Sequence, residues 1–324
     1  MKNILIMGCG ELGSRHLQGL LLSHNPLSIV VYDTFEKSLS LAMARANEVD
    51  MDNHFNNKII NYTTNPECLR SNWDLAILAT TAETRLEALK RLLDCSSVKS
   101  LILEKLLTQS VDDLIEMKSV LECNVEAWVN CPRRHMKTYK DIKQYIREKL
   151  GTTCLSIEVN IGYSELVTNA IHFLELHAWL NDTEIVDLRP ERLGPWLESK
   201  RRNNYDTSGV LKATYKDNSC LRINCVDSPI ETTLQLSVSE GCILVNEITG
   251  IWHDLQSNEN HGHLEFQSTM TGSIADLILD QATNFDSSLP KFQEIYEMHT
   301  LMLEVFGHHW NSSTSQSVRV IPIT

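Results

Sequence analysis

The sequence lacks three features that would place it in a large functional class. No apolar run approaches the roughly 20 residues of a membrane-spanning helix. Lys and Arg number 29 against 42 Asp and Glu, a formal net charge of −13, which argues against broad binding to nucleic acids or anionic membranes. The nine cysteines are scattered without a C-x-x-C pair, so neither a disulfide framework nor a thiolate zinc site is indicated. We therefore expect a cytoplasmic protein with reduced thiols and a small-molecule ligand.

The length and composition of the chain predict how it is divided into domains. The 324 residues are 42% hydrophobic, which fits two packed domains better than one. No internal repeat or low-complexity segment is seen. The apolar run at the start stops at Gly8 and continues into a glycine pattern, so it is not expected to be a signal peptide.

Three glycines, Gly8, Gly10 and Gly13, form a Gly-x-Gly-x-x-Gly pattern near the start of the chain. The pattern follows a short apolar run and precedes leucines at helical spacing, so it lies between a predicted strand and a predicted helix. A second apolar run, 28–32, ends at Asp33, about twenty residues beyond the last glycine. This context favours a dinucleotide-binding fingerprint over a glycine-rich turn.

Each position of the fingerprint has its own physical role. Gly8 permits the tight turn, Gly10 lets the backbone approach a pyrophosphate, and Gly13 allows close packing of helix on strand. The helix begins near Glu11 and Leu12, and its first N–H groups and positive dipole end favour phosphate. We expect this loop to bind the cofactor, with Asp33 on the ribose hydroxyls.

Strand and helix patterns alternate through the first part of the chain. Further strands are predicted at 74–79, 100–103 and 125–129, with helices at about 84–94 and 110–122. Continuous apolar strands separated by helices indicate a parallel sheet covered on both faces. The sequence therefore predicts an α/β Rossmann domain over 1–130, with a connecting helix at 136–149 that leads to about residue 150.

From 151 to 324 the pattern changes to alternating strands with turn signals between them. Strands are predicted at 153–162, 210–216, 219–227, 231–239 and 242–247. Helices are predicted at about 168–181, 272–282 and 290–306. We expect a C-terminal α+β domain on an open, mostly antiparallel sheet, which binds substrate and forms the oligomer contact.

Polar residues follow two of the predicted parallel strands. Thr80 and Thr81 follow one of them, and Glu104 and Lys105 follow the next. Ligands bind beyond the carboxyl ends of strands at the switch point of such a sheet, so we expect these residues beside the cofactor. Next to a cationic nicotinamide, a partly desolvated Lys105 would move toward its neutral form and shuttle a proton. The alternative is a surface lysine paired with Glu104.

Two basic stretches are candidates for contact with an anionic substrate. Arg133 and Arg134 follow a predicted strand and either clamp an anion or cap the next helix. The segment 189–202 contains Pro, Gly and Trp and ends in Lys-Arg-Arg. It is interpreted either as a loop that steers an anionic sugar or as an ordinary solvated loop.

One predicted helix of the second domain carries a polar stripe. Asn169, His172 and Glu175 are spaced i, i+3 and i+6, so they share a face that points away from the apolar face. His172 alone fits a structural histidine as well as a catalytic one. A separate pattern, His261-Gly-His263-x-Glu265, has no further ligand nearby in the sequence, so no metal site is expected.

In this order the motifs resemble the Gfo/Idh/MocA family, named after glucose-fructose oxidoreductase, inositol dehydrogenase and a rhizopine-catabolism protein. The resemblance rests on Gly-x-Gly-x-x-Gly-x-Arg-His, Glu-Lys at 104–105, Asn-x-x-Arg-Arg at 130–134 and the helix with His172. It implies a Rossmann domain followed by a mixed α/β domain whose open sheet face often forms a dimer contact. It also implies NAD(P)-dependent hydride transfer at a carbon of a sugar, cyclitol or sugar nucleotide.

The resemblance assigns the catalytic candidates residue by residue. The family's Lys of Glu-Lys-Pro and His of Asp-x-x-x-His match Lys105 and His172. Thr168 stands at the position of the acid and, with Asn169, is a candidate substrate contact. In the resulting hypothesis, His172 hydrogen-bonds the substrate hydroxyl while Lys105 relays its proton.

Two further positions depart from the family pattern. Leu106 replaces the Pro, and Arg85 stands where the family often has His. Two other interpretations stay open, and the missing Pro and the missing acid support the second of them. One is a reductase of an imine or tetrapyrrole on the same fold, and the other is a non-catalytic dinucleotide-binding sensor or assembly protein.

Asp33 also indicates which cofactor is bound. A 2′-phosphate about 4 Å from this carboxylate would meet roughly 4 kcal/mol of repulsion per unit charge at an effective dielectric constant of 20. NAD is therefore favoured, although Lys37 lies nearby in the sequence and NADP is not excluded. The expected partners are a sugar-like small molecule and a second copy of the chain, in a homodimer or homotetramer.

Overall fold

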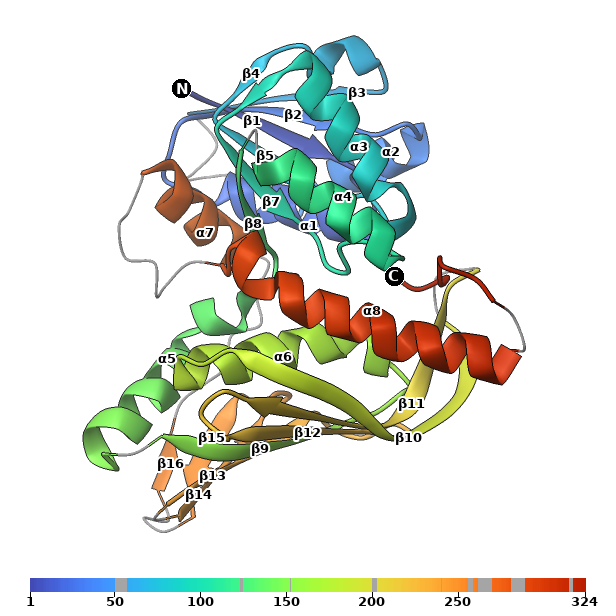
Figure 1. The fold of residues 1–324 in the computed structure, drawn as a ribbon. Coiled ribbons are helices and arrows are strands. Elements are labelled where there is room, and N and C mark those ends of the chain that lie inside the picture. Colours follow the sequence, from blue (N-terminus) through green and yellow to red (C-terminus); the bar gives the residue numbers. More distant parts are fainter. Residues whose placement is uncertain are drawn as a thin grey trace. The chain divides into compact units, whose positions relative to one another are not determined.

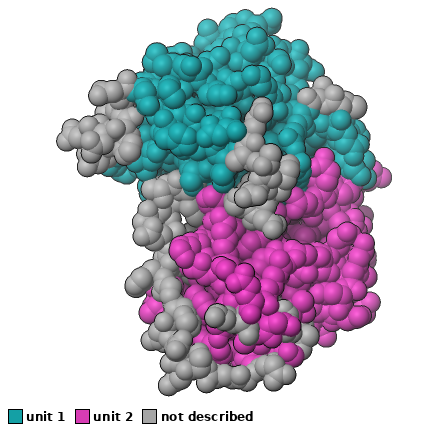
Figure 2. Space-filling view, turned by 90° about the vertical axis from the view of Figure 1, so that its left-hand side faces the viewer, with its two compact units in different colours: residues 1–108, 113–130, 267–292 teal, residues 109–112, 131–266, 293–324 magenta. Residues whose placement is uncertain are grey.

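The structure is a computed structural model that describes residues 1–49, 57–122, 125–151, 153–199, 203–239, 241–255, 259–261, 270–280, 289–314 and 317–324. Figure 1 shows its helices and strands. The chain forms two compact units, coloured in Figure 2. The first comprises 1–108, 113–130 and 267–292, and the second comprises 109–112, 131–266 and 293–324.

The first unit is built on a six-stranded sheet in the order β3-β2-β1-β5-β7-β8, in which all neighbours are parallel. Its strands are β1 (Lys2–Met7), β2 (Leu27–Tyr32), β3 (Lys58–Thr63), β5 (Leu75–Leu78), β7 (Ser100–Leu103) and β8 (Glu126–Val129). Successive strands are added on one side of β1 as far as β3 and on its other side from β5 to β8. The topological switch point therefore lies between β1 and β5, as in the Rossmann fold. The predicted parallel sheet is thus confirmed. A separate two-stranded sheet pairs β4 (Asn72–Trp73) with β6 (Ser97–Val98).

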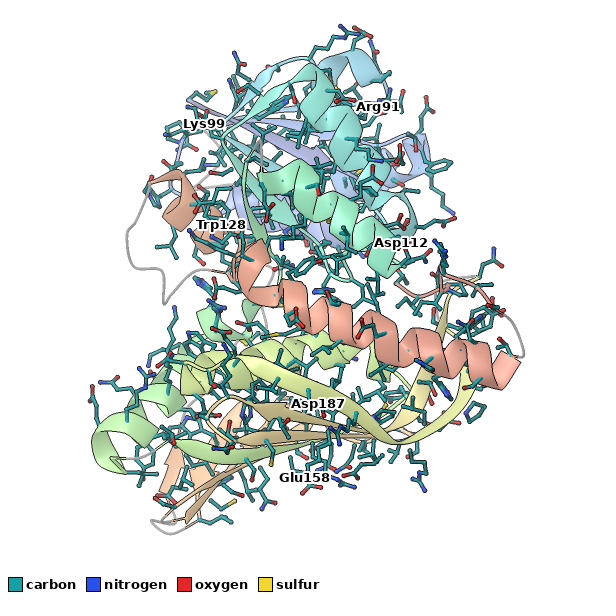
Figure 3. The ribbon with its side chains drawn as sticks, viewed as in Figure 1. Arg91, Lys99, Asp112, Trp128, Glu158 and Asp187 are labelled. Carbon is teal, nitrogen blue, oxygen red and sulfur yellow. The ribbon has the colours of Figure 1, made fainter. Side chains whose placement is uncertain are left out.

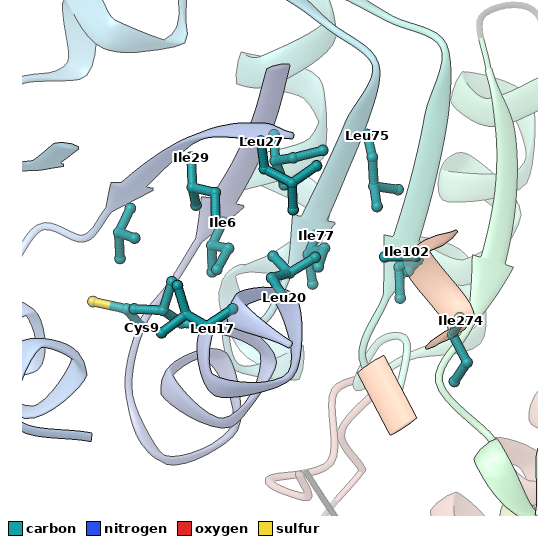
Figure 4. Packing of buried hydrophobic residues seen from close by; sticks show 14 of the residues in the cluster. Ile6, Cys9, Leu17, Leu20, Leu27, Ile29, Leu75, Ile77, Ile102 and Ile274 are labelled. Carbon is teal, nitrogen blue, oxygen red and sulfur yellow. The ribbon is translucent and has the colours of Figure 1, made fainter. Parts of the chain in front are cut away.

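Helices cover both faces of this sheet, as Figure 1 shows. They are α1 (Glu11–Leu21), α2 (Glu36–Ala46), α3 (Ala82–Cys95), α4 (Val111–Glu122) and α7 (Met270–Leu279). One cluster of buried hydrophobic residues contains Trp128 of β8, labelled in Figure 3, together with leucines of α1 such as Leu17 and Leu20. Figure 4 shows these leucines beneath Ile6 and Ile77 of neighbouring strands. Burial on both faces explains why the strands are continuous apolar runs.

Helix α7 belongs to the first unit, although its sequence falls in the range expected for the second domain. It packs on α1 so closely that a Cβ atom on Gly272 would lie 2.3 Å from the carbonyl oxygen of Gly19. The Asp276 carboxylate accepts hydrogen bonds from the Ser23 hydroxyl and, at 2.8 Å, from the Asn25 amide. Long-range packing, rather than position in the sequence, therefore assigns this helix to its unit.

The second unit is built on an eight-stranded sheet in the order β10-β11-β12-β9-β13-β14-β15-β16. Its strands are β9 (Cys154–Ile161), β10 (Ile185–Glu198), β11 (Tyr205–Tyr215), β12 (Cys220–Cys225), β13 (Thr233–Val238), β14 (Gly241–Asn246), β15 (Ile251–Asp254) and β16 (Glu259–His261). Neighbouring strands are antiparallel except for the parallel pair of β12 and β9. The sheet is mostly antiparallel, as predicted.

The described part of this unit contains three α-helices. α5 (Lys137–Gln144) continues into a π-helical turn, Tyr145–Lys149. α6 (Leu166–Asn181) packs on β9, β11 and β12. In α8 (Phe292–Thr314), Trp310 meets Trp196 of β10 edge to face, with ring centroids 5.0 Å apart. None of the helices in the described ranges is both long enough and apolar enough to cross a membrane.

The opposite face of this sheet is polar. Arg222 on β12 donates to Glu158 on β9 at 3.1 Å and to Glu191 on β10 at 3.0 Å. These side chains are partly exposed, and Figure 3 shows Glu158 on the side of the sheet away from α6. The alternation of buried and half-exposed residues along β9 and β12 follows from one covered face and one open face.

The structure corrects the prediction of a loop at 189–202. Most of this segment lies in β10, an edge strand paired with β11. Pro190 and Pro195 obscure the strand in the sequence, but an edge strand tolerates residues that lack an N–H donor. The pairing register shifts between Pro190 and Arg192 and again between Leu193 and Trp196. Residues 200–202 lie outside the described ranges, so the steering role of the three basic side chains stays a prediction.

Candidate functional site

The glycine loop lies at the switch point between β1 and β5. Gly8 has a φ of +86°, and a Cβ atom there would lie 2.8 Å from the backbone nitrogen of Thr80. A Cβ on Gly13 would lie 1.9 Å from the carbonyl oxygen of Gly8. Gly10 differs, because an added Cβ would meet no described atom within 4 Å. Gly8 and Gly13 are therefore required by the protein itself, whereas Gly10 faces open space.

Asp33 lies beside this loop at the carboxyl end of β2. Its Oδ2 accepts the Cys9 N–H at 2.8 Å and its Oδ1 accepts the Phe35 N–H at 2.9 Å. Burial and the neighbouring Asp33 carboxylate raise the pKa of the Cys9 thiol, so Cys9 is a neutral thiol at physiological pH. A carboxylate has about four acceptor positions, so Asp33 retains acceptor capacity for ribose hydroxyls.

The first turn of α1 is held in place from α2. Arg45 donates to the Glu11 carboxylate at 2.5 Å, to the Glu11 carbonyl oxygen at 2.8 Å and to the Ser14 hydroxyl at 2.7 Å. Gly10 occupies the N-cap position and Leu12 lies in the first turn. The first N–H groups of a helix have no acceptor within the helix. This turn therefore suits an anion such as a pyrophosphate.

Thr80 and Thr81 lie across the switch point from the glycine loop. The backbone nitrogen of Thr80 is the close neighbour of Gly8 described above. Its Oγ1 is buried, and within the described part of the chain it has no hydrogen-bond partner. Thr81 is the N-cap residue of α3, and its Oγ1 lies 3.2 Å from that of Thr84. The Thr80 hydroxyl is thus a buried polar atom whose hydrogen-bonding capacity no described residue uses.

Glu104 has a different environment from the one expected of a cofactor contact. It is 2% exposed, and its Oε1 lies 2.6 Å from His16 Nε2 and 2.6 Å from the Asn130 amide nitrogen. Burial raises the pKa of this carboxyl, but the hydrogen bonds from His16 and Asn130 outweigh it, and the pKa lies below its usual value. Glu104 therefore ties α1, β7 and β8 together, which the sequence analysis missed although His16 was part of its motif.

Lys105 follows Glu104 directly and is half-buried. The peptide bond between Lys105 and Leu106 is cis. Leu106 and Leu107 are 2% and 0% exposed, so the backbone after Lys105 runs into the interior. The Lys105 side chain thus extends from a buried loop at the carboxyl end of β7.

The candidate residues of the second unit lie at the start of α6. This helix is buried over most of its surface, but Thr168, Asn169 and His172 are half-exposed. The Asn169 amide donates to the Glu165 carbonyl oxygen at 3.0 Å, and the Thr168 hydroxyl donates to the Thr324 carbonyl oxygen at 3.2 Å. The three residues therefore form a polar surface one turn long.

A buried carboxylate that the sequence analysis missed caps this helix. Asp206 on β11 accepts the N–H groups of Val167 at 2.7 Å, Thr168 at 3.0 Å and Thr207 at 2.8 Å. Burial raises the pKa of Asp206 to about 6, although hydrogen bonds from Thr168 and the backbone oppose the shift. The sequence near residue 166 does not indicate that the cap of this helix comes from a distant strand.

The structure also corrects the polar stripe on α6. Glu175 does not face away from the core, since it is 1% exposed. Its Oε1 accepts from Arg134 Nε at 2.5 Å, and Arg134 also donates to Glu294 at 2.8 Å. Burial raises the pKa of Glu175 to about 7 against the opposing charge of Arg134. Because α6 is buried nearly all round, helical spacing alone did not identify its exposed side.

The two adjacent arginines are neither an anion clamp nor a solvent-facing cap. Arg133 is bidentate to Glu247, with both nitrogen-to-oxygen distances 2.7 Å, and its guanidinium lies 4.4 Å from the ring centre of Phe173. Tyr139 donates to the same carboxylate. Arg133 and Arg134 are 7% and 6% exposed. Their charges are neutralised within the second unit, so the structure gives no support to their predicted contact with substrate.

The structure thus brings the glycine loop, Asp33 and Thr80 together in the first unit, and Thr168, Asn169 and His172 together in the second. In the described ranges, no group of three or more His, Cys, Asp and Glu side chains is arranged to hold a metal ion. The pattern at 261–265 lies largely outside the described residues, which include only the backbone of His261.

Comparison with known proteins gives structural matches only. No protein-family model and no curated protein sequence matches the chain. A super-repressor mutant of Gal80p from Saccharomyces cerevisiae has a TM-score of 0.73 at 12% identity, over 97% of this chain and 96% of that one. UDP-N-acetylglucosamine 3-dehydrogenase from Acidithiobacillus ferrooxidans has a TM-score of 0.70 at 12% identity, over 94% and 96% of the two chains.

A third solved structure is myo-inositol dehydrogenase from Lactobacillus casei in complex with NAD(H) and myo-inositol. It matches with a TM-score of 0.68 at 12% identity, over 100% of this chain and 98% of that one. Identities this low establish shared architecture. The chain therefore has the fold of the Gfo/Idh/MocA-type oxidoreductases, as the resemblance of its motifs implied.

Proposed function

We propose that the protein is an NAD-dependent oxidoreductase that acts on a CH–OH carbon of a sugar, cyclitol or sugar nucleotide. The observation that carries the proposal is the arrangement at the switch point. Space is open at Gly10, and the Asp33 carboxylate accepts the Cys9 N–H of the same loop. The backbone nitrogen of Thr80 lies against Gly8, and its buried hydroxyl has no hydrogen-bond partner among the described residues. Ligands of open α/β sheets bind at such a point.

The residues present fit a dinucleotide. The α1 N-terminus would hold the pyrophosphate, Asp33 the ribose hydroxyls, and Thr80 a polar group of the cofactor. When bound, the nicotinamide supplies the acceptor or donor of hydride. The Asp33 carboxylate is hydrogen-bonded to backbone N–H groups and repels a 2′-phosphate, which is why we propose NAD rather than NADP.

The proposed proton chemistry uses the two catalytic candidates that the family resemblance assigns. Lys105 would take up or release the proton of the reacting hydroxyl, and His172 would hydrogen-bond that hydroxyl. Thr168 and Asn169 would supply neutral hydrogen-bonding groups to a polyol beside His172. The substrate class is supported by dehydrogenases among the similar structures, such as one for UDP-N-acetylglucosamine and one for myo-inositol.

The first test is a titration of the protein with NADH and NADPH, followed by energy transfer from tryptophan to the nicotinamide. It is repeated with cyclitols, neutral sugars, uronic acids and nucleotide sugars while absorbance reports turnover. Tighter binding of NADH than of NADPH, together with turnover of one of these classes, is the expected result. Turnover only of imines or tetrapyrroles would replace the substrate class and keep the cofactor.

A second candidate function is a dinucleotide-binding regulator without turnover. Thr168 stands where the family has an acid, and Thr cannot ionise near neutral pH. Two of the similar structures are of Gal80p, one of which is described as a transcriptional regulator from Kluyveromyces lactis. Tight NADH binding without turnover of any class in the panel would favour this function over the first.

We also propose that the protein assembles as a homodimer or homotetramer through the open sheet face of the second unit. Arg222, Glu158 and Glu191 place one positive and two negative charges on three strands of this face. Two copies of the face would therefore present opposite charges to each other. Sedimentation of the wild type and of Arg222→Glu tests this. A monomeric wild type would remove the proposal, and so would an oligomer that the substitution leaves intact. We propose a cytoplasmic location together with this activity.

A further inference from the structure

Arg85 is completely enclosed within the first unit. It lies on α3, is 1% exposed, and ranks among the largest fully buried side chains. Its guanidinium donates hydrogen bonds to the carbonyl oxygens of Thr80 and Leu106, and to that of Leu107 at 3.3 Å. One side chain therefore joins the loop after β5 to the loop after β7.

These two loops carry residues of the proposed site. Thr80 has its backbone nitrogen against Gly8 and carries a buried hydroxyl, and Leu106 directly follows Lys105. By binding the carbonyl oxygens behind them, Arg85 fixes the backbone from the interior while the Lys105 side chain stays half-exposed. The contact acts on backbone atoms, so its effect on Lys105 is one of position.

The chemistry of the contact suits arginine. A guanidinium is planar and has five donors in a rigid fork, so it serves several carbonyl oxygens at once. Lysine has a compact charge on a flexible stem, and histidine has two ring nitrogens. Neither reproduces donation to two separate loops from one buried plane.

The charge of Arg85 is balanced close to the same loop. Burial raises the pKa of Glu104, whereas hydrogen bonds from His16 and Asn130 and the positive charge of Arg85 lower it. Glu104 precedes Lys105, and Arg85 binds the carbonyl oxygen of Leu106, which follows it. The anion and the cation therefore lie at the two sequence neighbours of Lys105. A buried cation is tolerated where it is paired and hydrogen-bonded.

We propose that Arg85 is a positioning residue that sets the geometry of Lys105 and Thr80 for cofactor and substrate. The inference rests on the proposed function, because it gives Lys105 and Thr80 their roles. It extends that function by assigning the alignment of both loops to a side chain that touches neither cofactor nor substrate.

The test compares Arg85→Ala, Arg85→Lys and Arg91→Ala. Arg91 is an exposed arginine on the same helix, labelled in Figure 3, and serves as the matched control. Lysines are reductively methylated with a carbon-13 label, and the Lys105 signal is assigned by NMR with a Lys105→Arg variant. In cofactor-free protein, Arg85→Ala is expected to move the Lys105 signal toward those of exposed lysines. Arg91→Ala should leave it in place.

Cofactor affinity and chemical rescue provide the second readout. NADH binding should weaken at least about tenfold in Arg85→Ala, because the loop that carries Thr80 loses the hydrogen bond that holds it at the Thr80 carbonyl oxygen. Free guanidinium at millimolar concentration should restore both the Lys105 signal and the affinity, while an equal concentration of sodium chloride should not. Arg85→Lys keeps the charge without the fork and is expected to resemble Arg85→Ala without rescue.

An unchanged Lys105 signal in a folded Arg85→Ala protein would overturn the inference, even if its melting temperature fell, because Arg85 would then be a general stabiliser. If Arg85→Ala does not fold, an unchanged signal in Arg85→Lys decides the matter in the same way. If wild-type protein binds no NADH, the proposed function fails. The Lys105 signal of cofactor-free protein still tests whether Arg85 positions the loop.

Discussion

A Cβ atom on Gly13 would lie 1.9 Å from the carbonyl oxygen of Gly8, whereas one on Gly10 would meet no described atom within 4 Å. Two glycines of one motif thus have different requirements. Gly13→Ala should lower the free energy of unfolding by about 1–3 kcal/mol or more, through overpacking against backbone. Gly10→Ala should fold with a loss below about 1 kcal/mol but bind NADH at least tenfold more weakly. Urea denaturation and NADH titration of both variants check this, and wild-type NADH affinity in Gly10→Ala would contradict it.

Asp33 should determine the choice of cofactor. Asp33→Asn keeps an oxygen to accept the Cys9 N–H but removes the charge that repels a 2′-phosphate. At about 4 kcal/mol per unit charge, the preference for NADH over NADPH should fall by up to about a thousandfold. The measurement is the ratio of the two dissociation constants. Asp94→Asn, an equal charge change on the exposed end of α3, should leave the ratio as in the wild type.

Lys105→Met should slow turnover by about 10² to 10⁴, the usual contribution of a general acid or base. Affinity for NADH should stay near the wild-type value, because the pyrophosphate and ribose contacts lie on other loops. The control is Lys99→Met, which removes an exposed lysine paired with Asp74. Steady-state rates with the substrate found in the panel provide the check, and undiminished turnover would remove Lys105 from the mechanism.

Arg134 should matter for stability rather than for substrate affinity. Arg134→Leu leaves Glu175 buried without its cation and should cost about 3–5 kcal/mol of unfolding free energy. The double variant Arg134→Leu, Glu175→Leu removes both charges and should recover most of that loss. Denaturation of the single and double variants measures both. A single variant of wild-type stability with a raised KM for an anionic substrate would restore the clamp hypothesis.

His177 should make the second unit sensitive to acid. Burial lowers the pKa of His177 to about 4 from an ordinary 6.5, and its ring is stacked on Tyr215 at 4.1 Å. The unfolded chain therefore binds a proton at a pH where the folded chain does not. The unfolding free energy should be unaffected above pH 6.5 and decline by about 1.4 kcal/mol per unit as pH falls toward 4.

Glu175 and Asp206 act in the opposite direction, since burial raises the pKa of each carboxyl. The effect of His177 is therefore isolated by comparison with His177→Gln. The difference in stability between wild type and variant should shrink as pH falls from 6.5 to 4. A difference independent of pH would show that His177 titrates normally in the folded protein.

Local sequence signals predicted those parts of the fold that local interactions determine. The Rossmann strands appear as apolar runs because both faces of the sheet are covered, and the glycine loop is recognisable because Gly8 and Gly13 meet backbone atoms nearby. Strand β10 was missed because its two prolines are acceptable only at a sheet edge, which is a property of the assembled sheet.

Partners that are distant in sequence were beyond prediction. Arg133 and Glu247 are 114 residues apart, and Arg134 and Glu175 are 41 apart. No spacing rule connects such pairs. The cap that Asp206 provides for α6 is of the same kind, as is the buried contact of Arg85 with two loops. The motif therefore identified the loop at the switch point, which we propose binds the cofactor, whereas the interior contacts that hold the candidate residues emerged only from the fold.

The docking of α7 onto α1 has a consequence for biosynthesis. The chain leaves the first unit at Asn130, and Met270 of α7 is made 140 residues later. At about 5–20 residues per second, the ribosome needs roughly 7 to 28 seconds to deliver it. During that interval the surface around Gly19 and Ser23 is exposed on the nascent first unit, which cannot be completed until most of the second unit has been synthesised.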